Sequence, residues 1–198
     1  MKSIIYIGLM LVLFGCRSQK SGEKEEVYFF QDKEISRARS RSFRNIEYFK
    51  MKSENDSLIT YNIFPRKNIG KLDSHELEQV RTLLSKIIGS EFDPGKKAMI
   101  HLYSNNESNI YVDSNYKKYW DWIETNSHLY QAFLIGTKDS QIVPDSDHIY
   151  IDEYDLLEHL FFRQSPFQTN HFLLKPDGEI YTYFGFQDIL DVLDYCVD

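Results

Sequence analysis

The chain has few cysteines and lacks the paired thiols of redox enzymes. Its 198 residues include two, Cys16 and Cys196, and no Cys-x-x-Cys pair occurs. Thiol-disulfide exchange through a dithiol motif is therefore excluded. If Cys16 is modified, a single thiol remains and no intramolecular disulfide can form. We interpret Cys196 as incidental; the alternative is a disulfide between two copies of the chain.

Other motifs that carry chemistry are also missing. The sequence contains no phosphate-binding glycine loop and no nucleophile elbow. No two histidines have the i, i+4 spacing of a helical metal site. We therefore predict no catalytic residue, no cofactor and no metal site, and a protein that is not an enzyme. Each histidine is interpreted as structural or exposed; they lie at positions 75, 101, 128, 148, 159 and 171.

The charge balance is acidic. Lys and Arg total 23 against 30 Asp and Glu, a net charge of −7. Such a surface repels phosphate backbones, so we predict no nucleic-acid partner. Four arginines cluster between Ser36 and Arg44. We interpret this run as a solvated face balanced by carboxylates; a site for anionic lipid or polysaccharide is the alternative.

The N-terminus has the pattern of an export signal. After Lys2, an apolar run extends from Ile4 to Phe14 and is broken only by Gly8. It is shorter than the roughly twenty residues of a spanning helix and fits the hydrophobic region of a secretory signal. The stretch Leu13-Phe14-Gly15-Cys16 resembles the lipobox of bacterial lipoproteins.

This resemblance implies a lipid anchor. Residues 1–15 would be a cleaved signal peptide, the Cys16 thiol would receive diacylglycerol, and its amine would receive an acyl chain such as palmitate. The alternative is an ordinary signal or a short anchor with an incidental cysteine. Residues 16–26 are predicted to form a flexible, polar tether. No aspartate follows Cys16, which in lipoprotein families with a sorting rule implies the outer membrane. We predict a lipid-anchored protein of the cell envelope, periplasmic or surface-facing.

Residues 27–96 are predicted to form an N-terminal α+β extension. Its clearest element is a helix from Ser74 to Ile88, where Asp73 and Glu76 can form a capping box and Gly89 provides the C-terminal stop. Strands are expected over Val27–Phe30, Ile46–Lys52 and Ser57–Phe64.

Residues 97–198 are predicted to form an α/β domain in the order β-α-β-α-β-β-α. Strands separated by helices indicate parallel pairing, and the turn Lys175-Pro176-Asp177-Gly178 predicts an antiparallel hairpin closed by a glycine bulge. A helix over Asn115–Thr125 is expected to be capped by Asp113 or Ser114. The other elements are expected at Lys97–Tyr103, Leu129–Ile135, His148–Asp152, Glu153–Arg163, Phe172–Phe184 and Gln187–Tyr195. The helix over Glu153–Arg163 is expected to bury Leu156, Leu157, Leu160 and Phe161.

This order, together with the stretch Phe172-Leu173-Leu174-Lys175-Pro176-Asp177-Gly178-Glu179-Ile180, resembles the thioredoxin-like superfamily. The resemblance implies a mixed sheet flanked by helices. It also implies where a redox site would lie: at Ser104 to Ile110, where no cysteine occurs, and at Thr169, where the family has a cis-proline. The implied domain is therefore redox-inactive.

One acidic cluster is a candidate calcium site. It lacks the glycine and terminal glutamate of an EF-hand, so a solvated loop followed by a helix start is the favoured interpretation. The cluster comprises Asp145, Asp147, Asp152, Glu153 and Asp155.

We predict a binding or accessory module with a protein or peptide partner in the envelope. Its expected groove lies near Ser104 to Ser108 and Thr169. One alternative is an enzyme of unknown class. The other is a purely structural envelope protein. The enzyme alternative requires that two or three side chains converge on one pocket: Asp152, His171, His101 and Glu107.

Overall fold

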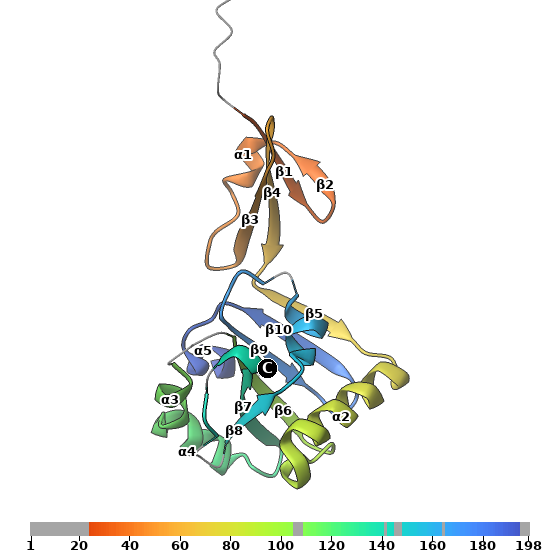
Figure 1. Cartoon of the computed structure of the whole chain (residues 1–198), viewed down its shortest axis with the longest axis vertical. Helices are drawn as coiled ribbons and strands as arrows, with labels where there is room; N and C mark the ends of the chain where they lie inside the picture. The colour runs from red at the N-terminus through yellow and green to blue at the C-terminus, as the bar shows by residue number, and fades with distance from the viewer. Residues whose placement is uncertain (1–23, 105–108, 141, 145–147, 164, 195–198) are drawn as a thin grey trace, which may run out of the picture.

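The computed structural model describes residues 24–104, 109–140, 142–144, 148–163 and 165–194. Within them the chain forms two mixed sheets flanked by helices, which confirms the predicted α/β class. One sheet has four strands and the other has six. Figure 1 shows the smaller sheet at one end of the molecule and the larger sheet, with most of the helices, at the other. The predicted signal peptide, Cys16 and Cys196 lie outside the described residues. Within the described part, no helix has the length and apolar character needed to cross a membrane.

The four-stranded sheet has the order β2-β1-β4-β3. The expected strands are present; β3 and β4 pair antiparallel, while β1 pairs parallel to β4. A short helix, α1, lies beside this sheet at the end remote from the six-stranded sheet (Figure 1). The elements are β1 (Glu25–Phe30), β2 (Lys33–Ile35), α1 (Arg37–Ser40), β3 (Tyr48–Glu54) and β4 (Leu58–Pro65).

The six-stranded sheet has the order β5-β10-β9-β6-β7-β8. Strands β6, β7 and β8 are parallel, and β9, β10 and β5 are added antiparallel, each to the one before. β5 comes from the segment predicted as an N-terminal extension, so this sheet begins before Lys97. The strands are β5 (Lys67–Lys71), β6 (Lys97–Tyr103), β7 (Tyr130–Thr137), β8 (Ile149–Asp152), β9 (Thr169–Leu174) and β10 (Glu179–Phe184).

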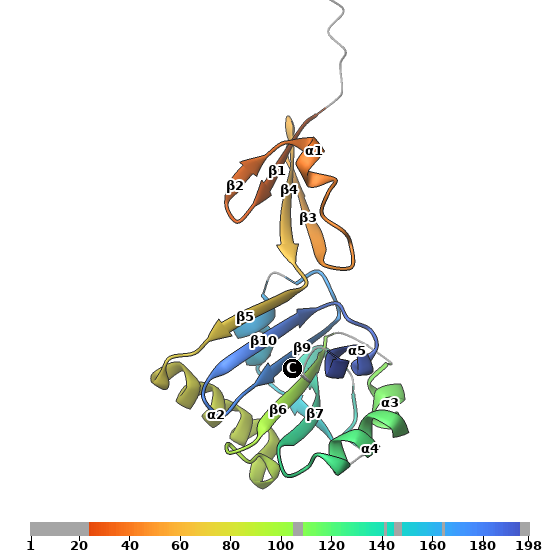
Figure 2. The same ribbon diagram turned by 180° about the vertical axis from the view of Figure 1, so that it is seen from behind.

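Helices cover both faces of this sheet (Figure 2). Side chains alternate along a strand, so Ile100 and Leu102 of β6 pack against α2 and η3, whereas Met99 packs on the opposite side with α4 and α5. A small further helix, α3, follows β6. The helical segments are α2 (Ser74–Ile88), α3 (Asn109–Ser114), α4 (Lys117–Thr125), the π-helix η3 (Glu158–Phe162) and α5 (Ile189–Asp194).

Two local predictions are confirmed in detail. The Asp73 side chain accepts from the backbone N–H of Glu76, and the Glu76 carboxylate accepts from the N–H of Asp73, which is the predicted capping box of α2. In the β9–β10 hairpin, Gly178 has φ of 87° and its N–H donates to the Lys175 carbonyl at 3.0 Å. Lys175 N–H donates to the Glu179 carbonyl, which closes the predicted glycine bulge.

The helix predicted over Asn115–Thr125 is wrong in its first turn. The structure has a break at Tyr116, between α3 and α4, and Tyr116 precedes α4 without a side-chain cap. Asp113 does not cap α4: it lies within α3, and its buried carboxylate accepts a hydrogen bond from the Tyr103 hydroxyl at 2.6 Å.

The helix predicted over Glu153–Arg163 begins three residues later than expected and is mostly a π-helix. One turn at Leu156 leads directly into the π-helix η3, whose wider turn brings residues five apart onto one face. Leu157 and Phe162 are therefore buried, whereas Leu156 and Leu160, expected in the core, are exposed.

The two sheets are joined at Arg66, between β4 and β5. Its guanidinium donates to the carbonyls of Phe184 (2.9 Å) and Asn45 (2.7 Å) and lies over the Phe167 ring at 4.6 Å from the centroid. The Phe49 ring packs against Phe184 beside it, with ring centroids 5.5 Å apart. One cation and several aromatic rings therefore hold the sheets together.

Candidate functional site

A pair of histidines lies at the centre of the six-stranded sheet. His101 of β6 and His171 of β9 are direct cross-strand partners, and their Nδ1 atoms are 2.7 Å apart. Sheet pairing brings together two side chains separated by 70 positions in the chain. Both are fully buried, on the face covered by α4 and α5, where His101 Nε2 also lies 2.5 Å from the Tyr119 hydroxyl.

The hydrogen bonds of this pair have one direction when both rings are neutral. His171 Nε2 lies 2.8 Å from the Phe186 carbonyl, which can only accept, so Nε2 carries the proton and Nδ1 is an acceptor. His101 Nδ1–H then donates to His171, and His101 Nε2 accepts from the hydroxyl of Tyr119. A single chain of donors therefore connects α4 to the loop after β10.

Burial keeps both rings neutral. It lowers the pKa of His101 well below its usual range, and the neighbouring His171 lowers it further. It also lowers the pKa of His171 to about 4, although the hydrogen bond to Phe186 opposes the shift. A first proton must enter a dry interior, and a second would place two N–H groups face to face. The pair is therefore a packed structural element at neutral pH.

The side chains that the enzyme alternative requires do not share a pocket where the structure describes them. His101 and His171 converge, but neither is exposed. Asp152 lines a groove on the opposite face of the sheet, and Glu107 lies outside the described residues. The Asp152 carboxylate accepts from the backbone N–H of Leu157 at 2.8 Å, at the turn that leads into η3. Burial raises the pKa of Asp152, and hydrogen bonds from backbone N–H groups oppose this shift.

The other members of the acidic cluster do not form a cation site in the described part of the chain. No group of three metal-binding side chains occurs there. The Asp155 carboxylate accepts from the Lys138 backbone N–H at 2.7 Å. Asp145 and Asp147 lie outside the described residues. Where it is described, the cluster shapes the turn after β8, and Asp152 is buried there rather than solvated as expected.

Ser104 and Thr169 are neighbours, as the expected groove requires, but their side chains are buried. Thr169 pairs with Tyr103, and the Ser104 N–H donates to the Gln168 carbonyl at 2.7 Å. The buried Ser104 hydroxyl makes no hydrogen bond. Neither residue lines the grooves described below. Residues 105–108, the rest of the expected groove, lie outside the described residues.

An open groove occurs elsewhere, between α2 and the segment from β8 to η3. It encloses about 820 Å³. Three of its side chains are large, apolar and exposed: Tyr154 (75%), Leu160 (61%) and Leu156 (43%). Its apolar lining comprises Leu83, Ile87, Ile151, Tyr154, Leu156 and Leu160. We call it the α2–η3 groove.

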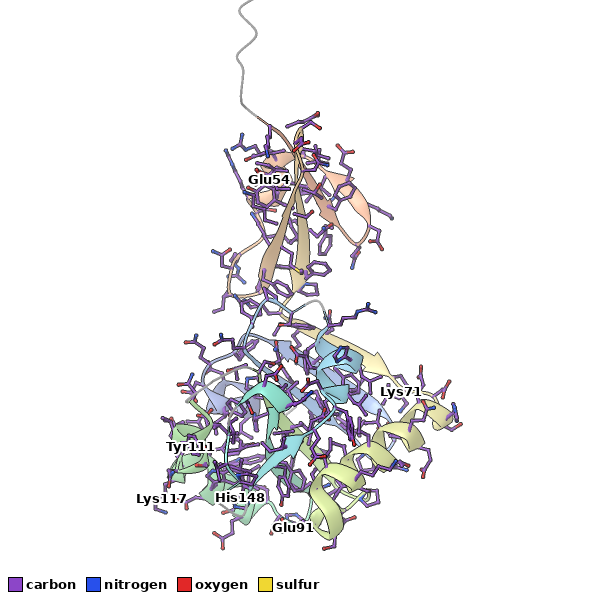
Figure 3. The ribbon with its side chains drawn as sticks, viewed as in Figure 1. Glu54, Lys71, Glu91, Tyr111, Lys117 and His148 are labelled. Atoms are coloured by element: carbon purple, nitrogen blue, oxygen red, sulfur yellow. The ribbon has the colours of Figure 1, made fainter. Side chains whose placement is uncertain are left out.

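The rim of the α2–η3 groove is mostly acidic. Glu78 on α2 and Glu153 after β8 line it, against one lysine, Lys86. Figure 3 helps to locate α2, since Lys71 lies near its start and Glu91 just beyond its end. Because exposed apolar patches rimmed by polar residues mark interaction sites, this groove is the best-formed candidate surface.

The arginine run is mostly solvated, as predicted. Ser36 caps α1, whose Arg37 lies 3.4 Å from Glu26, while Arg44 pairs with Glu47. Arg39 is exposed and forms no ion pair in the described part of the chain. Part of the charge is therefore balanced by carboxylates.

No protein-family model matches this chain, and no curated protein or solved structure shows a significant match. The sequence named His101 and His171 as side chains that could converge but did not predict their direct contact, and it did not predict the α2–η3 groove. A signal exists for His101, which interrupts the apolar run from Ala98 to Tyr103, because a polar residue in such a run needs a partner. His171 follows polar residues and gives no such signal. The groove has no such signal, since it depends on the π-helical turn.

Proposed function

We propose that the chain is a lipid-anchored envelope protein whose folded part is a redox-inactive binding module. The lipobox ending in Cys16 supports the anchor. An outer-membrane location follows from the residues after Cys16. One observation carries the binding function: the histidine pair His101 and His171 is buried away from solvent, whereas the large apolar α2–η3 groove is open to it. Catalysis needs the reverse arrangement, with chemical groups exposed to a substrate.

The proposed fold is a thioredoxin-like unit built from β6, β7, β9 and β10. Their order is β10-β9-β6-β7, with β6 and β7 parallel and the hairpin strands antiparallel. Helices α4 and α5 on one face and η3 on the other agree with this proposal. In such a fold the redox site would follow β6, at Ser104, beside Thr169. The sequence has no thiol there.

The proposed occupant of the α2–η3 groove is an amphipathic peptide segment of an envelope protein. Leu156 and Leu160 offer it apolar contacts, and the acidic rim favours basic residues flanking its apolar face. Helical ligands commonly bind grooves of this kind through apolar side chains on one face. The α2 helix provides a rigid wall because its own inner face is fixed in the core through Val80, Leu84 and Ile88.

A peptide-library selection tests this function. The full chain in detergent micelles serves as bait, and selected peptides are then mapped by hydrogen exchange. We expect enriched peptides to share spaced apolar residues with basic flanks and to protect amides of α2 and of residues 153–160. Protection confined to other elements would contradict the proposed groove. Failure to enrich any peptide would favour the structural alternative.

A reductase assay tests the proposal that the folded part is redox-inactive. With insulin and a dithiol donor, the chain is expected to give no reduction above the background of the donor alone. Reduction that is lost in Cys196→Ser would contradict the proposal, because Cys196 is the thiol that remains once Cys16 is lipidated.

A further inference from the structure

A second, smaller cavity lies where the two sheets meet. It encloses about 350 Å³ and is separate from the α2–η3 groove, with which it shares one residue, Leu160. Both sheets and the π-helix contribute to its wall. The lining comprises Phe49, Phe64, Asn68, His159, Leu160, Phe161, Arg163 and Phe184. We call it the junction pocket.

The walls of the junction pocket are aromatic. Phe49 lies against Phe64 and Phe184, with ring centroids 5.4 and 5.5 Å away. The surrounding structure fixes the positions of these rings, since Phe49 is buried and the Arg66 guanidinium donates a hydrogen bond to the Phe184 carbonyl. Preformed walls of this kind favour a flat apolar group, because aromatic pairs contribute beyond the area they bury.

The ionisable side chains of the pocket are all basic. Arg163 and His159 line it, and no carboxylate does among the residues that the structure describes, in a chain where acidic residues outnumber basic ones. Arg163 is exposed, and no carboxylate pairs with it among the described residues. His159 Nδ1 donates to the Asp155 carbonyl at 2.7 Å, which leaves Nε2 as the ring nitrogen without a hydrogen-bond partner among the described residues.

The π-helix η3 is an independent indication that the junction pocket is a functional site. His159, Leu160 and Phe161 all belong to η3, and all three line the pocket. π-helical turns are rare and occur frequently at functional sites, because they place side chains that an α-helix would turn away. Here the wider turn brings the imidazole and an aromatic ring into the same cavity.

We propose that the junction pocket binds a carboxylate attached to an aromatic or large apolar group. The ring enters between the phenylalanines, and the carboxylate pairs with the Arg163 guanidinium, with which it can form two parallel hydrogen bonds. The same chemistry occurs in a peptide that ends in an aromatic residue and in a free aromatic carboxylate. This site does not depend on the α2–η3 groove.

Saturation-transfer and titration NMR on the full chain in detergent micelles test this site. The probes are N-acetylphenylalanine, its carboxamide, acetyl-Ala-Ala-Phe and the carboxamide of that peptide. We expect each acid to bind about ten- to a hundredfold more tightly than its amide. Tighter binding of the tripeptide acid than of the single residue identifies a peptide C-terminus as the ligand, and the opposite order identifies a free carboxylate.

Two matched variants locate the binding. Arg163→Gln is expected to bring the acids down to the affinity of their amides, whereas Arg39→Gln, which changes an exposed and unpaired arginine on α1, leaves the preference unchanged. Equal binding of acid and amide to the unmodified chain overturns the proposal, as does the absence of saturable binding. A preference that persists in Arg163→Gln also overturns it. None of these outcomes bears on peptides bound at Leu156.

Discussion

His101 and His171 face each other across β6 and β9, with 2.7 Å between their Nδ1 atoms and no exposure to solvent. The Nε2 atoms of both rings are also hydrogen-bonded, that of His101 to the Tyr119 hydroxyl and that of His171 to the Phe186 carbonyl. The whole chain of hydrogen bonds is complete without charge. This relationship explains why two titratable groups that converge do not form an exposed reactive site.

The histidine pair is expected to make stability depend on pH. Folding lowers the pKa of both rings, so the unfolded chain binds more protons below about pH 6.5. The stabilising contribution is therefore complete above this pH and is lost as the pH falls towards about 4. Each histidine contributes a slope of up to about 1.4 kcal/mol per pH unit. Urea unfolding between pH 7 and 4 measures this slope.

The control for this prediction is a pair of variants. In the double variant His101→Leu, His171→Leu the slope is expected to flatten, whatever its stability at pH 7. His128→Gln changes an exposed histidine and should leave the slope as it is. An unchanged slope in the double variant would show that other groups titrate.

Tyr119→Phe is expected to destabilise the chain by about 1–3 kcal/mol, because it leaves the buried Nε2 of His101 without its donor. Tyr154→Phe removes the same hydroxyl from an exposed ring and should cost less than about 0.5 kcal/mol. Chemical denaturation at pH 7 gives both values. Equal effects of the two substitutions would show that the hydrogen bond between Tyr119 and His101 does not contribute to stability.

Arg66→Met is expected to loosen the junction between the sheets. The variant loses the bonds to the carbonyls of Phe184 and Asn45, which we expect to cost about 1–3 kcal/mol. Native-state hydrogen exchange should accelerate in β3 and β4 more than in β6. Arg39→Met is the matched control. Uniform acceleration across both sheets would mean that they unfold as one unit and that Arg66 does not set their coupling.

Cys16→Ser is expected to release the chain from the membrane fraction and to abolish incorporation of labelled palmitate. Several acyl chains give stable anchoring, since each buried methylene contributes about 0.8 kcal/mol. Cys196→Ser is the matched control and should change neither result. Membrane retention of the Cys16→Ser chain would contradict the lipid anchor.

Local sequence signals predicted local structure well. The capping box at Asp73 and the turn at Gly178 each depend on residues within a few positions, and both have the predicted hydrogen bonds. The strand β5 escaped prediction because Lys67–Lys71 contains one apolar side chain, Ile69, which is exposed at the edge of the sheet. Its position is determined by pairing with β10.

The candidate sites were harder to predict because each depends on long-range geometry. His101 and His171 meet through the register of two strands, and no local pattern encodes that register. The exposure of Leu156 and Leu160 follows from a π-helical turn, whereas ordinary helical spacing assigned both to the core. Both proposed binding surfaces could therefore be identified only from the three-dimensional structure.

The affinity of the selected peptides most directly tests whether this is a binding module that uses the α2–η3 groove. Calorimetry should compare the unmodified chain with the double variant Leu156→Ser, Leu160→Ser, and with a control double variant, Val112→Ser, Val143→Ser, which alters exposed apolar residues elsewhere. We predict a loss of at least about tenfold for the leucine variant, since two apolar contacts contribute more than about 1.4 kcal/mol, and little change for the valine variant. Unchanged affinity in the leucine variant would contradict the account.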